Sequence, residues 1–140
     1  MRKIRVVSLF AIILLALVLV ACEGFSATGS SERANAGLFG GDVTVRYKTA
    51  NGSISESIET EGEPEEVLDA IVTLSVEKGT FRIELLGEDD AVTLVLEARD
   101  GQTVSGEGQM VIDSFSEANY RVTATEAENV EYTIQYEFRQ

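Results

Sequence analysis

Beyond residue 41 the chain alternates apolar and polar residues, and this alternation constrains the fold more than any other feature. Successive side chains of a β-strand point to opposite faces, so a period of two predicts strands with one buried face. Turn-forming residues interrupt the alternation about every ten residues, as they do in sandwiches and barrels. The predicted buried faces are Val43/Val45/Tyr47, Ile54/Ile58, Leu68/Ala70/Val72/Leu74/Val76, Phe81/Ile83/Leu85, Val92/Leu94/Leu96/Ala98, Val104/Met110/Ile112, Tyr120/Val122/Ala124 and Val130/Tyr132/Ile134/Tyr136/Phe138.

A polar residue followed by glycine marks each of three positions where a strand is expected to end. Asn51-Gly52 is typical of a tight hairpin, because both residues tolerate the positive φ angles of such turns. Lys78-Gly79 and Asp100-Gly101 predict further turns. Gly106 and Gly108 fall inside a strand pattern and predict a bulge or bend there.

These patterns predict an all-β fold, an antiparallel β-sandwich of immunoglobulin-like or jelly-roll type with about eight strands over residues 42–140. Pro64 and the acids around it would also suit the first turn of a helix. Ile71 and Val72 are β-branched, which favours a strand from about Leu68 and leaves open a single helical turn before it.

The N-terminus has the features of a secretory signal peptide. Arg2, Lys3 and Arg5 precede an apolar run from Val6 to Ala21, which is shorter than the roughly 20 residues of a transmembrane helix. Residues 1–21 are therefore expected to form a signal helix. Residues 22–41 are small and polar without periodicity, which predicts a flexible tether that holds the domain roughly 20–25 Å from the site of attachment.

The sequence Leu19-Val20-Ala21-Cys22 resembles the lipobox of bacterial lipoproteins, and Cys22 is the only cysteine. The resemblance implies that Cys22 carries a palmitate-type acyl group, becomes the mature N-terminus and anchors the protein to the plasma or outer membrane of a bacterial cell envelope. Glu23 at the next position would permit sorting to an outer membrane. Plain secretion and an uncleaved anchor remain the alternatives.

The C-terminal half resembles pre-peptidase C-terminal domains, small sandwich domains of secreted bacterial proteins. The likeness lies in the rhythm of strand, glycine and strand from about residue 79 and in the Tyr132-x-x-x-Tyr136 strand. It implies a noncatalytic accessory role and transfers no site residues.

The charge of the chain excludes one class of partner. Residues 1–21 hold three of the 11 basic residues and none of the 24 acidic ones, so the rest of the chain carries a net charge of −16. Nucleic acid would be repelled by such a surface, and no nucleic-acid partner is expected.

Several kinds of catalytic chemistry are excluded as well. The chain has no histidine, which rules out Ser-His-Asp and Cys-His sites. No Gly-Lys-Ser/Thr motif is present, and no cofactor is expected. The leading hypothesis is therefore a noncatalytic, membrane-anchored binding or structural module with a protein or glycan partner. The alternative is a carboxylate-based, glycosidase-like hydrolase on the cell surface.

The remaining candidate residues are acids and tyrosines. Glu88, Asp89 and Asp90 are weak candidates for calcium ligands, and a polar turn is the simpler interpretation, so no metal site is predicted. Tyr132 and Tyr136 lie in phase with core residues, which favours packing over a sugar-stacking platform. A solvated acidic edge or loop is predicted from the glutamates at positions 59, 61, 63, 65 and 66.

Overall fold

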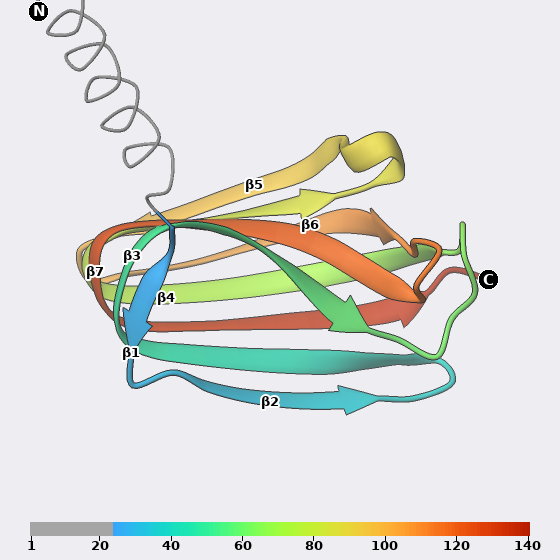
Figure 1. Ribbon diagram of the computed structural model, residues 1–140, viewed down its shortest axis with the longest axis horizontal. Helices are drawn as coiled ribbons and strands as arrows, with labels where there is room; N and C mark the ends of the chain where they lie inside the picture. Colours follow the sequence, from blue (N-terminus) through green and yellow to red (C-terminus); the bar gives the residue numbers. More distant parts are fainter. Residues whose placement is uncertain (1–23) are drawn as a thin grey trace, which may run out of the picture.

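Three very long strands dominate the structure, a computed structural model that describes residues 24–140 (Figure 1). They are β3 (Gly40–Glu59), β4 (Val67–Leu86) and β7 (Glu117–Phe138). The shorter elements are β1 (Ser26–Thr28), β2 (Ser31–Ala36), the one-turn 3-10 helix η1 (Glu88–Asp90), β5 (Val92–Arg99) and β6 (Gln102–Val111). Every strand pairing is antiparallel, which confirms the predicted antiparallel β-sandwich. Among the described residues, no helix has the length and apolar character needed to span a bilayer.

The sandwich is a single sheet folded over on itself, because each long strand crosses from one layer to the other. The order along the sheet is β1-β3-β7-β4-β5, with β2 beside β3 and β6 beside β4. Layer A consists of β2, β6 and residues 40–50, 67–78 and 127–138. Layer B consists of β5 and residues 52–59, 80–86 and 117–125.

The strands cross between layers at one end of the molecule, which we call the corner (Figure 1). Each crossing contains a residue with positive φ, at Gly52 (104°), Gly79 (79°), Gly101 (74°) and Asn129 (50°). Side chains join neighbouring crossings: the Gly79 N–H donates to Asp100 Oδ1 at 2.7 Å, and Asn129 Nδ2 donates to a carboxylate oxygen of Glu77. The residues with positive φ thus lie at the same end of neighbouring strands, and together they bend the sheet at the corner.

The hairpin predicted at Asn51-Gly52 is therefore wrong. Residues on both sides of this pair belong to β3 and pair with β7, as Tyr47 does with Val130 and Ile54 with Val122. A residue with positive φ can bend a strand as well as reverse it, and the sequence signal is the same for both. Lys78-Gly79 likewise bends β4. At Asp100-Gly101 one strand does end, but β5 and β6 then pair with the two halves of β4.

The flexible tether predicted for residues 22–41 is also wrong over residues 26–36. β1 pairs with residues 49–51 of β3, and β2 pairs with residues 41–46. Phe25 packs edge-on against Tyr47 with ring centroids 5.4 Å apart. β2 shows no alternation because all six of its residues are exposed, so backbone hydrogen bonds rather than a buried face hold this edge strand.

The glycines of β6 have a different role from the predicted bulge. β6 pairs with β4 in unbroken register from Val67↔Val111 to Val76↔Gln102. A Cβ on Gly106 would lie 3.1 Å from Leu94 Cδ1 and 3.3 Å from Leu96 Cδ1. These glycines therefore let side chains of β5 approach the backbone of β6 closely.

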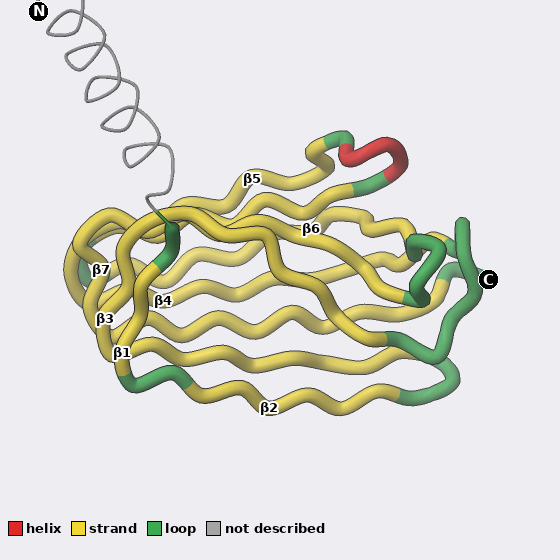
Figure 2. The backbone as a smooth tube through the Cα atoms, in the orientation of Figure 1, coloured by secondary structure: helices red, strands yellow, loops and turns green. Residues whose placement is uncertain are grey.

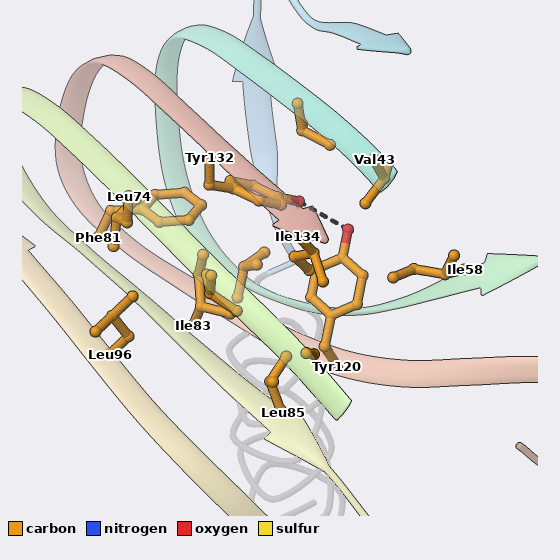
Figure 3. Close-up of a cluster of buried hydrophobic side chains, with 14 of the residues drawn as sticks. Val43, Ile58, Leu74, Phe81, Ile83, Leu85, Leu96, Tyr120, Tyr132 and Ile134 are labelled. Atoms are coloured by element: carbon orange, nitrogen blue, oxygen red, sulfur yellow. Dashed lines mark hydrogen bonds between the residues drawn. The ribbon is translucent and has the colours of Figure 1, made fainter. Parts of the chain in front are cut away.

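The predicted buried faces meet between the layers (Figure 3). Phe81 of layer B stacks on Tyr132 of layer A with ring centroids 5.7 Å apart, and the Tyr120 and Tyr132 hydroxyls are hydrogen bonded at 2.8 Å. Val92 and Ile54 are exceptions, because they are 47% and 38% exposed. β4 begins at Val67 without a preceding helical turn, as the favoured strand interpretation predicts.

Candidate functional site

The one modification site predicted from sequence lies outside the described residues. Cys22 and the signal segment 1–21 precede Gly24, where the description begins. Their predicted roles stay predictions. Only three residue steps separate Cys22 from Phe25, which is docked on the domain. Extended chain covers at most about 11 Å over that distance.

The weak calcium candidates form the connection between β4 and β5. Glu88, Asp89 and Asp90 make up η1, and they line a hollow of about 450 Å³ together with Glu65 and Asp113, among other residues. Nowhere in residues 24–140 do three or more carboxylate, cysteine or histidine side chains come together in a group that could hold a metal ion. The turn therefore offers no preformed metal site.

The tyrosines of the last strand belong to the core. Tyr132 is 1% exposed and Tyr136 is 3% exposed, so neither presents a ring face to a sugar. Burial raises the pKa of the Tyr132 hydroxyl, and the same cause raises that of Tyr120. The predicted core role is confirmed, and the Tyr132 hydroxyl is buried and hydrogen bonded to the Tyr120 hydroxyl.

A groove of about 760 Å³ lies over layer A. We call it the layer A groove; its lining residues are Phe39, Gly40, Gly41, Asp42, Asp69, Ala70, Ile71, Glu107, Gly108, Gln109, Gln135, Tyr136 and Glu137. It crosses β3, β7, β4 and β6, which are neighbours in the sheet.

Strand register places the side chains of this groove in two rows on the outer face of layer A. One row runs Asp42, Gln135, Ile71 and Glu107, because each is the register partner of the next. The adjacent row runs Glu137, Asp69 and Gln109. Rows of this kind bring carboxylate and amide groups to strand spacing, about 4.8 Å apart.

Two further residues shape the groove. Phe39, in the turn between β2 and β3, is 74% exposed at one end of it. The Arg139 guanidinium binds both oxygens of Asp69, at 2.5 Å and 3.2 Å, and this salt bridge lowers the repulsion between Asp69 and its cross-strand partner Glu137. The groove therefore offers hydrogen-bonding groups, one exposed aromatic ring and a net negative charge.

The arrangement of acids does not resemble a glycosidase pair. Such a pair needs one carboxyl group held protonated beside a cleft. Burial raises the pKa of Glu56, with a further contribution from the negative charge of Glu32. Glu56 pairs with Tyr120 and lies in phase with the inner residues of β3, so it is not among the residues that line the groove.

Sequence reasoning missed the groove entirely. Its residues occupy the polar phase of four strands and span positions 39–137, so no local motif joins them. Ile71 was the one available signal, because it is an apolar residue in the outward phase of β4 and is 45% exposed.

Of the comparisons with known proteins, only that with solved structures found similar proteins. No family model matches the chain, and no curated protein matches it. The xylan-binding CBM22-1 domain of Paenibacillus barcinonensis Xyn10C is 14% identical, with a TM-score of 0.38 over 84% of this chain and 86% of that domain. A chain of the Bacillus endospore appendages, described as disulfide-linked pili, is 12% identical, with a TM-score of 0.44 over 81% and 95%.

A third similar structure is the CBM22-1–GH10 part of Clostridium thermocellum xylanase 10B, solved with xylohexaose. It is 10% identical, with a TM-score of 0.45 over 84% of this chain and 26% of that one. All three scores lie below 0.5, and the proposals below rest on the residues of this chain alone.

Proposed function

We propose that this protein is a noncatalytic, lipid-anchored binding module whose ligand is a neutral glycan held in the layer A groove. The observation that carries the proposal is the groove itself, an open depression with two rows of carboxylate and amide side chains. Sugar hydroxyls donate to carboxylates and exchange hydrogen bonds with amides, so such rows suit a polyhydroxylated chain.

The charge and shape of the groove narrow the ligand class. Asp42, Asp69, Glu107 and Glu137 make it acidic, which disfavours uronic acids, phosphates and sulfates. Phe39 supplies an apolar ring on which one face of a sugar can stack. The groove is open along its length, which suits a stretch of polymer rather than an enclosed small molecule.

A hydrolase has no comparable support. Asp69 is bound by the Arg139 guanidinium, and Glu56, whose pKa is raised by burial, is not among the groove residues. Binding needs neither a proton donor nor a nucleophile, so the groove can serve it as it stands.

Native affinity gels test the glycan proposal. The chain lacking residues 1–21 should be retarded in gels that contain one of four soluble neutral polysaccharides, a β-glucan, xylan, mannan or dextran. Gln135→Ala should weaken retardation about fivefold, since a lost hydrogen bond costs about 1 kcal/mol. Thr103→Ala, on the same strand-face outside the groove, is the matched control and should leave it unchanged. Retardation by none of the four, or equal retardation of both variants, would refute the proposal.

The anchor proposal is tested separately. We expect a fatty-acid analogue to label the wild-type protein and membranes to retain it, while Cys22→Ser is unlabelled and is released or left with its signal uncleaved. Because Phe25 is docked beside the corner, an acylated Cys22 would hold the corner close to the lipid rather than 20–25 Å away. Unlabelled wild-type protein found free in the medium would contradict the anchor.

A further inference from the structure

Three large apolar side chains are exposed to solvent at the end of the sandwich opposite the corner. Leu38 is 77% exposed, Phe39 74% and Phe115 80%, the highest values among the large hydrophobic residues described. We call this end the loop end, because the connections 37–39, 60–66, 87–91 and 112–116 gather there (Figure 2). Exposed apolar groups that cluster on one surface mark interaction sites.

The turns that carry these side chains are tied to the rest of the fold. The Asp113 carboxylate accepts hydrogen bonds from the backbone N–H groups of Phe115 and Glu117 at 2.8 Å and 3.0 Å. Phe39 O accepts from the Phe138 N–H at 3.1 Å. The turns that carry the exposed apolar side chains are therefore already ordered before a partner binds, which lowers the entropy cost of binding.

Loop 60–66 links the turns 37–39 and 112–116 through its contacts. It also makes the loop end acidic. Thr60 donates its backbone N–H to Ser116 O at 3.0 Å, and a Cβ on Gly62 would meet both Ile112 and Phe138. The acids of the loop end are Glu59, Glu61, Glu63, Glu65, Glu66, Glu88, Asp89, Asp90, Asp113 and Glu117. None of these ten takes part in the salt bridges found within residues 24–140. The loop end thus combines apolar anchors with uncompensated negative charge.

We propose that the loop end is a docking surface for a protein partner that presents basic residues around apolar pockets. The negative charge disfavours anionic membranes and a second copy of the same end, since both would be repelled. Basic residues on the partner would match the ten acids, and Leu38 and Phe115 would enter its pockets. The site lies away from the corner, so the lipid anchor proposed above would leave it facing outward.

A peptide titration followed by ¹⁵N NMR tests this surface. The probe is a nine-residue peptide of alternating lysine and leucine, and a lysine–serine peptide of equal charge is its control. We expect the leucine peptide to bind at least tenfold more tightly and to shift the amide signals of residues 37–39, 60–66 and 112–117. Phe39 also lines the layer A groove, whereas residues 60–66 and 112–117 do not, so shifts of the latter two segments report on the loop end independently of the glycan proposal.

Variants separate the apolar and charged contributions. Phe115→Ser should weaken peptide binding at least fivefold, whereas Val95→Ser, at a half-exposed apolar residue of β5, should not. Glu61→Gln with Glu63→Gln should also weaken it, while Glu126→Gln at the corner should have no effect. Three results would overturn the proposal: equal binding by Phe115→Ser, vesicle binding that Phe115→Ser abolishes, or self-association in sedimentation that this variant abolishes.

Discussion

Two glycines at the corner provide a matched test of how the sheet is folded. Gly79 and Gly101 have similar positive φ angles, 79° and 74°. A Cβ on Gly101 would meet nothing within 4 Å. A Cβ on Gly79 would lie 2.6 Å from both the Glu126 carbonyl carbon and Thr125 O, and closer still to Glu126 O. The main difference between alanine at the two sites is therefore the steric clash at position 79.

The expected loss of stability follows from that difference. The left-handed conformation costs alanine about 1–2 kcal/mol, and restriction of the unfolded chain returns about 0.4–1 kcal/mol. Gly101→Ala should therefore lose roughly 0–1.6 kcal/mol. Gly79→Ala must also displace the β7 carbonyls and disturb the hydrogen bond from its N–H to Asp100, worth about 1 kcal/mol. We expect it to lose at least about 2 kcal/mol more.

Thermal and urea unfolding of the chain 23–140 would measure this difference. At roughly 3–6 °C per kcal/mol for a domain of this size, the two variants should melt about 6–12 °C apart. Asp100→Ala in each background should remove part of the gap, since Asp100 accepts the Gly79 N–H. Equal melting of Gly79→Ala and Gly101→Ala would show that the two crossings are not packed as described.

Three further predictions concern stability. Ending the chain at Asn129 should abolish cooperative melting, because the removed part of β7 supplies apolar burial of about 8–15 kcal/mol gross against a net stability of about 5–15 kcal/mol. A sharp transition near the wild-type midpoint would contradict this. The pKa of Glu56 is raised above 4.5, so the folded state binds protons more tightly and stability should fall as pH rises above 4.5; in urea melts from pH 4 to 7, Glu56→Gln should flatten that decline. Calcium should raise the melting temperature no more than sodium chloride of equal ionic strength, and a calcium-specific rise removed by Asp90→Ala would show a real site.

Most of the core could be predicted from the sequence because its signal is local. Val72, Leu74 and Val76 alternate with exposed residues, and the same periodicity places them on one buried face whatever their partner strand. The corners could not be predicted in the same way. Asn51-Gly52 reports a positive φ and nothing about direction, and only its pairing with β7, some 70 residues later, distinguishes a bend from a hairpin.

The edge strand and the groove escaped prediction for a related reason. Ser31–Ala36 contributes no buried face, so it leaves no periodic signal. The groove is assembled from outward residues such as Asp42 and Gln135, which look in the sequence like any solvated strand positions. In the glycan proposal, their function depends on neighbouring side chains that only the strand register brings together.

The pairing of the first long strand with the last one has a consequence for the time at which the protein can fold. β3 pairs along its whole length with β7, and apart from β1 and β2 it has no other partner. Gly40 and Glu137 are register partners although 97 positions separate them, and contacts of such long range form late. The sandwich therefore cannot close until β7 has been synthesised. A chain with this topology stays open until β7 emerges, and if the predicted signal segment directs export, this delay would keep the chain unfolded while it crosses the membrane.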